Sequence, residues 1–257
     1  TNMAAKEMKL RIKKLAGEKA EKIWMGTFHS IFARILRVEA KKLDYEHNFS
    51  IYDKEDSVSL VNNILEQMNI SFDNYNPNNI HSKISFCKNH MISAEEYINN
   101  IASNAVERKI GEIFKEYTKR LKLNNSMDFD DLLLKPIELF NSNEKVLTKY
   151  RKQFRYILVD EFQDTNKAQY EILKMLVFGK TKLCVVGDDA QSIYGWRGAD
   201  IKNMLSFEND FPKCKVFRLE QNYRSTKTIL RAADSVIKNN QEQLTKTLWT
   251  DNEEGDK

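Results

Sequence analysis

A short apolar run that ends in two acidic residues constrains this chain most. Tyr156 to Val159 contains no charged side chain, and Asp160 and Glu161 follow it directly. Apolar runs of this length are typical of strands that are buried on both faces of a parallel sheet. Such a strand delivers its last residues to the carboxyl edge of the sheet, where α/β proteins bind their ligands. The sequence therefore predicts an α/β fold with a ligand site at Asp160 and Glu161.

Adjacent carboxylates at such an edge are costly unless a cation or a reaction uses them. Hydrolysis of a nucleoside triphosphate fits this pair. Asp160 would hold Mg²⁺, usually through water, and Glu161 would orient or deprotonate the attacking water molecule. The alternative is an acidic loop that follows a core strand and has no catalytic role.

The composition fits a soluble, globular protein in a reducing compartment, and we expect a cytoplasmic location. The 257 residues allow one large or two ordinary domains. The sequence has no apolar run of eighteen residues, so no membrane span is predicted, and its N-terminus has no apolar signal core. The three cysteines, Cys87, Cys184 and Cys214, are too widely spaced for a metal-type pair, and their odd number argues against a disulfide framework. We expect Cys184, which lies in an apolar run, to be a small core residue.

The net charge of +4 is small, but it is unevenly distributed. Residues 1–42 contain eleven Lys or Arg and four Glu, a net charge of +7, which leaves −3 for the remainder. A basic end is compatible with a polyanionic partner such as nucleic acid. Solvated helices often have the same composition, so charge alone leaves both interpretations open.

The middle of the chain differs from both flanks. Residues from about 44 to 122 are rich in Asn, Lys, Glu and Ile and predict four amphipathic helices with no strand. The flanks alternate strand and helix, which indicates a parallel sheet with right-handed crossovers. The predicted helices are 3–15, 29–42, 54–69, 77–89, 93–101, 104–122, one opening near 128, 166–178, 199–210 and 225–239, and the predicted strands are 23–28, 156–160, 183–187 and 216–219.

A second loop, residues 187–200, leaves the strand at 183–187 and should reach the same edge of the sheet as the acidic pair. The amide of Gln191 could donate a hydrogen bond to a phosphate oxygen or to the attacking water. Tyr194 and Trp196 lie beside Arg197, a combination that stacks bases and pairs with phosphate. The alternative is a glycine-rich turn whose tryptophan packs into the core.

Two further junctions could contact phosphate. Arg224 lies where a strand is expected to give way to a helix, a position from which an arginine finger can reach a γ-phosphate. Residues 26–30, Gly-Thr-Phe-His-Ser, form another such junction, which suits a nucleic-acid backbone. His29 could equally make only a structural bond at the helix start.

These stretches together resemble the UvrD/Rep/PcrA-type superfamily 1 DNA helicases. The strings VDEFQDTN, VVGDDAQSIYGWRGAD and LEQNYRST are long and specific, and TNMAAKEM, GTFHSIFARIL and MDFDDLL agree with further motifs of that family in the same order. The resemblance implies an α/β fold with a RecA-like parallel sheet flanked by helices and an all-helical inserted subdomain. It implies ATP bound between two RecA-like domains and single-stranded DNA running across them. The implied divisions are 1–43 and 123–218 for the first RecA-like domain, 44–122 for the insertion, and 219–257 for the start of the second domain.

The resemblance also implies a role for each matching residue. Asp160 would coordinate Mg²⁺, Glu161 would be the catalytic base, and Gln191 would sense the γ-phosphate of ATP. Arg224 would be the arginine finger and Tyr223 would pack on the adenine. The residues that would contact DNA are Asn2, Thr27, Phe28, His29, Tyr194, Trp196 and Arg197, with Trp196 stacking on a base. Met3 replaces the family's usual lysine, which removes one positive charge.

One family motif, the phosphate-binding loop GxxxxGK[ST], does not occur in this sequence. Gly179-Lys180-Thr181 is not that loop, because Lys174 stands where its first glycine should be and the tripeptide precedes a strand. We therefore expect a fragment of an ATP-dependent DNA helicase that translocates 3′ to 5′ on single-stranded DNA and acts at single/double-strand junctions. The alternatives are the motor of a helicase–nuclease enzyme and a non-catalytic module that binds DNA or protein.

The missing motif leads to a first prediction. Without the backbone amides and lysine of that loop, the β- and γ-phosphates of ATP lack their main anchor. We expect this 257-residue chain alone to hydrolyse ATP negligibly in single-turnover and steady-state assays, with or without single-stranded DNA. DNA-stimulated turnover by the chain would contradict this prediction.

Overall fold

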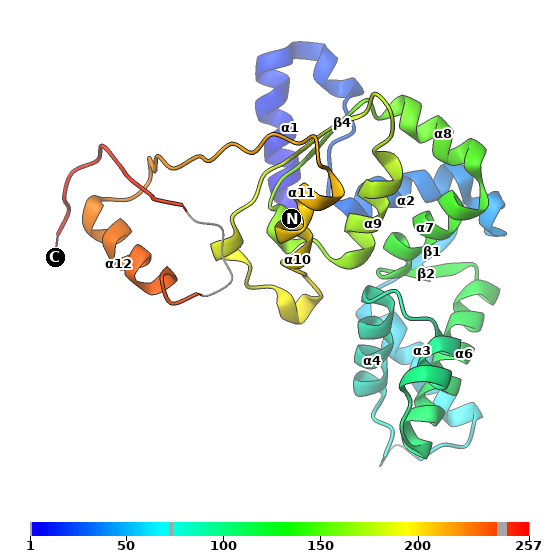
Figure 1. Cartoon of the computed structure of the whole chain (residues 1–257). Helices are drawn as coiled ribbons and strands as arrows, with labels where there is room; N and C mark the ends of the chain where they lie inside the picture. The colour runs from blue at the N-terminus through cyan, green and yellow to red at the C-terminus, as the bar shows by residue number, and fades with distance from the viewer. Residues whose placement is uncertain (1, 72–73, 241–245, 257) are drawn as a thin grey trace. The chain divides into compact units, whose positions relative to one another are not determined.

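The computed structural model describes residues 2–71, 74–240 and 246–256, apart from the side chains of Asn2 and Arg197 (Figure 1). Within them, no helix is long and apolar enough to cross a membrane. The helices and strands are α1 Asn2–Ala16, α2 Phe28–Glu39, β1 Ser50–Tyr52, α3 Lys54–Gln67, α4 Pro77–Asn89, α5 Ala94–Glu96, α6 Ala105–Leu123, β2 Ser126–Asp128, α7 Asp131–Ser142, α8 Glu144–Gln153, β3 Tyr156–Val159, α9 Lys167–Leu176, β4 Lys182–Val185, α10 Lys202–Leu205, α11 Phe207–Asp210 and α12 Lys227–Ile237.

The chain divides into two compact units. The first comprises Thr1–Ile157 and Asn166–Leu183, and the second comprises Leu158–Thr165 and Cys184–Lys257. Both strands of one sheet, β3 and β4, continue from the first unit into the second. The fold is mixed α/β, mostly helical, with small parallel sheets.

The first unit contains the helical middle of the chain, where α3 packs against α4 and α6 (Figure 1). The helix starts are specified locally. Asp53 and Asp56 form a reciprocal capping box at the start of α3, and Asn76 caps α4, whose first residue is Pro77. The apolar faces then bury Ile64, Ile84 and Tyr117, among others. The four helices predicted here are confirmed, although the third, α5, passes into a π-helical turn at Tyr97–Ile101.

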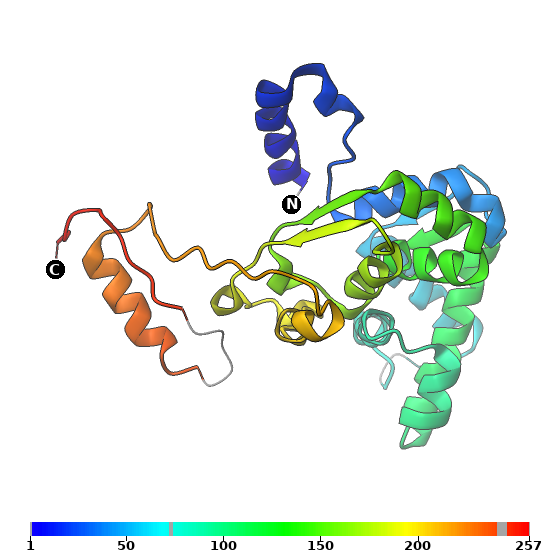
Figure 2. The ribbon, with the colours of Figure 1, turned by 45° about the horizontal axis from the view of Figure 1, so that its top comes forward.

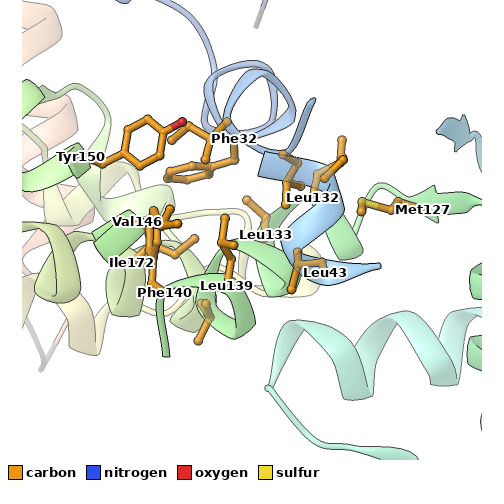
Figure 3. Close-up of a cluster of buried hydrophobic side chains, with 14 of the residues drawn as sticks. Phe32, Leu43, Met127, Leu132, Leu133, Leu139, Phe140, Val146, Tyr150 and Ile172 are labelled. Atoms are coloured by element: carbon orange, nitrogen blue, oxygen red, sulfur yellow. The ribbon is translucent and has the colours of Figure 1, made fainter. Parts of the chain in front are cut away.

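A second hydrophobic cluster lies in the same unit around α7. Helices α2, α8 and α9 all pack against α7. Figure 3 shows the side chains that meet there, with Phe32 of α2, Phe140 of α7, Val146 of α8 and Ile172 of α9 contributing one each to a shared core. All four are at most 3% exposed. Ile157 of β3 packs against this cluster.

Both sheets have two strands. β1 pairs with β2 in parallel, Ser50 opposite Ser126, so the prediction of no strand between residues 44 and 122 is wrong at this point. β3 pairs with β4 (Figure 2). The amide of Lys182 donates to the carbonyl of Arg155 at 2.9 Å and that of Val186 to Val159 at 2.8 Å, so the strands are parallel.

The prediction that β3 is buried on both faces is wrong. Ile157 and Val159 face the core, but Tyr156 and Leu158 are 74% and 77% exposed. Successive side chains of a strand point to opposite faces, and in the described chain the core covers only one of them. For the same reason Cys184 on β4 is exposed and is not the core residue that was expected.

Two predicted strands are irregular segments in the structure. Ile23 to Thr27 has no strand partner. Trp24 instead packs edge-to-face on Phe154, with ring centroids 5.3 Å apart. The Arg34 guanidinium carbon lies over the Trp24 ring, 3.8 Å from its centroid. Residues 216–219 are also irregular and largely exposed. The single helix predicted over residues 199–210 is two short helices, α10 and α11.

A buried lysine joins the helical middle of the chain to the rest of the first unit. The Lys88 ammonium, on α4, lies 2.7 Å from Asp128 Oδ2 and 2.9 Å from Asp131 Oδ1, and Tyr117 donates to Asp128 Oδ2 at 2.9 Å. Burial lowers the pKa of Lys88, but the attraction of the two aspartates outweighs it and holds that pKa above its usual range. Four elements, α4, α6, β2 and α7, thus meet at one charged centre.

This centre gives a stability prediction. Lys88→Met keeps most of the side-chain volume but leaves two carboxylates buried beside each other without a cation. We expect the free energy of unfolding, measured by urea denaturation, to fall by about 3–5 kcal/mol. The control is Lys109→Met, which removes only an exposed pair with Glu112 and should cost less than about 1 kcal/mol. Equal stability of the two variants would contradict the prediction.

Candidate functional site

The acidic pair lies in a loop whose backbone is held in an unusual conformation. Asp160 and Glu161 are both exposed, directly after β3. Glu161 has φ 51° and ψ 45°, a left-handed conformation that is uncommon for a residue with a side chain. Its amide donates to Asp160 Oδ1 at 3.1 Å, and the short helical turn Phe162–Asp164 follows. The turn redirects the chain so that both carboxylates stay at the strand end.

The loop after β4 comes into close contact with this acidic loop. The amide of Phe162 donates to the carbonyl of Val186 at 2.9 Å. A Cβ atom on Gly187 would lie 2.7 Å from Gln163 Oε1 and 3.2 Å from the Phe162 nitrogen, so only glycine fits there without a shift. The predicted convergence of the two loops at one edge of the sheet is confirmed.

The second loop is organised around Asp188. Gln191 Nε2 donates to Asp188 Oδ2 at 2.8 Å, and the amide of Ala190 donates to Asp188 Oδ1 at 3.1 Å. Lys246 forms ion pairs with Asp188 and, at 2.9 Å, with Asp189. Burial raises the pKa of Asp188, but the hydrogen bonds from Lys246 and Gln191 outweigh it and lower that pKa below its usual value. Gln191 therefore lies in the same loop cluster as the acidic pair, with its amide held by Asp188.

The aromatic residues of the second loop are exposed. Trp196 is 75% exposed and Tyr194 is 38% exposed, with ring centroids 6.5 Å apart and the rings inclined at 52°. Gly198, with φ 86°, ends the short turn that presents them. The alternative in which the tryptophan packs into the core is therefore wrong. The side chain of Arg197 lies outside the described residues.

Arg224 lies in a turn whose main-chain amides are held by the side chain of Asn222. Asn222 Oδ1 accepts from the amides of Arg224 and Ser225, at 2.9 and 2.8 Å, and the amide of Asn222 donates to the carbonyl of Trp249 at 2.8 Å. The side chains of Arg224 and Tyr223 are exposed, and the Tyr223 hydroxyl donates to Gln221 Oε1 at 2.7 Å. This turn precedes α12 without a preceding strand.

The remaining predicted DNA contacts belong to the first unit. Thr27 caps α2, its Oγ1 accepting from the amide of Ser30 at 3.3 Å. Phe28 is half-buried against the core. The ring of His29 packs edge-on to Phe129 at 6.0 Å, and burial lowers the pKa of His29. Asn2 is the first residue of α1, and its side chain lies outside the described residues.

The structure adds residues that the sequence reading did not single out. Gln163 and Asp188 connect the two loops, and Lys246 anchors the second one. Gln163 and Asp188 stand inside quoted motifs, so their positions carried a signal. Lys246 lies more than fifty positions further along the chain, and nothing in its local sequence marks it.

Asp160 is the residue best placed to hold a divalent cation. Among the described residues, no group of three or more His, Cys, Asp or Glu side chains is arranged to hold a metal. Mg²⁺ commonly needs only one or two protein carboxylates and takes its other ligands from water and substrate phosphates. Asp160 is exposed at the strand end, whereas Asp188 and Asp189 are occupied by Lys246. The donor set present therefore fits Mg²⁺ held through Asp160.

Three curated relatives carry the name ATP-dependent DNA helicase PcrA. The ATP-dependent DNA helicase PcrA of Bacillus subtilis (strain 168) is 47% identical over 255 residues, which are 99% of this chain and 34% of that protein. The proteins of the same name from Staphylococcus epidermidis (strain ATCC 12228 / FDA PCI 1200) and Staphylococcus aureus (strain NCTC 8325 / PS 47) are 48% identical over 257 residues, 100% of this chain and 35% of each protein. The chain thus spans about a third of the length of these relatives.

Two family models also match. The model of the UvrD-like helicase C-terminal domain matches residues 217–257. The model of the UvrD/REP helicase N-terminal domain matches residues 1–212, which is most of the chain. The chain therefore belongs to the UvrD/REP helicase family.

Proposed function

We propose that this chain carries the hydrolytic centre of a DNA-stimulated ATPase, part of an ATP-dependent DNA helicase. The observation that supports it most is the meeting of two loops at the ends of β3 and β4. There the Asp160–Glu161 pair and Gln191 lie in one cluster. The two loops pack so closely that only glycine fits at position 187 without a shift. The relatives, which are ATP-dependent DNA helicases, support the same proposal.

The proposed chemistry assigns a task to each residue of the cluster. Bound Mg²⁺ would neutralise charge on the β- and γ-phosphates of ATP. Asp160 would hold that ion, and Glu161 would orient the attacking water and accept its proton. Gln191 exchanges its bond to Asp188 for one to the γ-phosphate. Arg224 stabilises charge on the transferred phosphoryl group, and Tyr223 packs on the adenine.

We further propose a RecA-like sheet as the framework of this site. In such folds ligands bind outside the carboxyl ends of parallel strands, which is where both loops lie. The division into a first RecA-like domain at 1–43 and 123–218, a helical insertion at 44–122, and the start of a second domain at 219–257 belongs to the same proposal.

The partner in this proposal is single-stranded DNA next to a duplex junction, with movement from 3′ to 5′. Exposed aromatic rings bind single strands by stacking on bases, and Trp196 and Tyr194 offer two such rings in one loop. Further contacts are assigned to Arg197, Asn2, Thr27, Phe28 and His29. The basic stretch at residues 1–42 adds attraction for the phosphate backbone.

The role of Glu161 leads to a test in the full-length protein that contains this chain. Glu161→Gln keeps the size of the side chain but cannot accept a proton from water. We expect loss of DNA-stimulated ATP hydrolysis by at least about 100-fold, with unchanged affinity for single-stranded DNA. Glu171→Gln, which removes a surface carboxylate paired with Lys174, is the matched control and should hydrolyse ATP normally. Undiminished hydrolysis by the Glu161 variant would exclude the residue as the base.

Trp196 allows a second test, by fluorescence or anisotropy titration with a single-stranded oligonucleotide. We expect Trp196→Ala to weaken binding by about 1–3 kcal/mol, because one base loses its stacking partner, and Trp196→Phe to retain part of the affinity. Ile193→Ala in the same loop, where the side chain is 70% exposed but has no ring, should bind as the unchanged chain does. Identical titrations for the Trp196 and Ile193 variants would remove Trp196 from the DNA site.

A further inference from the structure

One buried amide side chain connects the two loops of the candidate site. Gln163 is 1% exposed. Its Nε2 donates to Glu161 Oε2 at 2.8 Å, and its Oε1 accepts from the main-chain amide of Asp188 at 3.0 Å. Its own main-chain carbonyl accepts from the Ser192 hydroxyl at 3.3 Å. Gln163 is thus bonded to the acidic loop and to both ends of the loop segment 188–192.

The neighbours of this amide fix its orientation. A main-chain N–H can only donate, so the atom facing Asp188 must be the amide oxygen. An ionised carboxylate can only accept, so the atom facing Glu161 must be the NH₂ group. The two contacts agree with one another, and a flipped amide would lose both bonds. The side chain is therefore held in a single state that points an N–H at Glu161.

We propose that Gln163 is a positioning residue that orients the Glu161 carboxylate for its reaction with water. Glu161 is exposed and its backbone is left-handed, so its own surroundings constrain the carboxylate little beyond this bond. The Gln163 amide fixes Oε2 of the carboxylate through the 2.8 Å hydrogen bond. Because the other end of the same amide holds Asp188, the orientation of Glu161 is tied to the loop that carries Gln191.

The close approach at Gly187 is what brings the amide into range of both partners. A Cβ atom at position 187 would lie only 2.7 Å from Gln163 Oε1, so a residue other than glycine would displace this amide. This inference rests on the proposed function, since it concerns the base of that reaction, but it assigns a task to a side chain that need not touch ATP, Mg²⁺ or DNA.

Two variants of the full-length protein separate positioning from simple support of the fold. Gln163→Leu removes both hydrogen bonds. Gln163→Glu keeps an oxygen that can accept from the Asp188 amide but has no N–H to donate to Glu161. Gln169→Glu is the control, because it adds the same charge six residues later, where the side chain accepts a bond from the Asn166 amide in the α9 capping box.

The measurements are kcat and KM for ATP in DNA-stimulated hydrolysis, together with the affinity for single-stranded DNA. We expect Gln163→Leu to lower kcat by about 10–100-fold, the loss equivalent to one hydrogen bond to a charged group, with KM and DNA affinity unchanged. We expect Gln163→Glu to lower kcat by a similar factor, because it also lacks the donor to Glu161. The Gln169→Glu variant should keep the kcat of the unchanged protein.

The outcomes distinguish this inference from the proposed function. An unchanged full-length protein that does not hydrolyse ATP, or a Glu161→Gln variant that still does, overturns the proposed function. An active protein that depends on Glu161 but keeps its kcat in both Gln163→Leu and Gln163→Glu overturns the role of Gln163 alone. If Gln163→Leu does not fold, Gln163→Glu still tests the role of Gln163, since it retains the acceptor for the Asp188 amide.

Discussion

The closeness of two loops at Gly187 governs the geometry of the candidate site. The main chains after β3 and β4 are bonded to one another through Phe162 and Val186, and Gly187 lies against the Gln163 amide with no space for a side chain. The positions of the acidic pair and of Gln191 are therefore not independent. A change that shifts one loop by a fraction of an ångström therefore shifts the other, so the geometry of the candidate site depends on both loops together.

The first unit depends on a different interaction, the buried ion pairs of Lys88. Two hydrophobic clusters lie on either side of it, one among α3, α4 and α6 and the other around α7. Apolar contacts are not directional and would allow these clusters several mutual arrangements. The charged centre selects one of these arrangements. Lys88 must contact both Asp128 and Asp131, because the two ion pairs offset the free-energy cost of removing its ammonium group from water.

Local signals determined which parts of this fold could be predicted from the sequence. The helix at Lys54–Gln67 has an amphipathic pattern, and the strand at Tyr156–Val159 is an apolar run that ends in charge, so both were predicted near their observed limits. The residues at 23–27 have a strand-like composition, but Trp24 packs against Phe154 and Arg34 instead of lying in a paired strand. The exposure of Leu158 and Cys184 could not be read from hydrophobicity, because it depends on which face of the sheet the rest of the chain covers. For the candidate site, the motif residues were identifiable, whereas the ion pairs of Lys246 depend on a contact between distant segments.

The depth at which Lys88 is buried separates two kinds of electrostatics in this protein. Dissolved ions screen charges that face water and have little effect on a lysine that is 3% exposed. The proposed contacts with the DNA backbone are of the exposed kind, since they exchange counterions with solvent. Under the proposed function, rising ionic strength would weaken binding to a polyanion while the Lys88 ion pairs persist. Binding of the partner and the architecture of the first unit would then respond to salt independently.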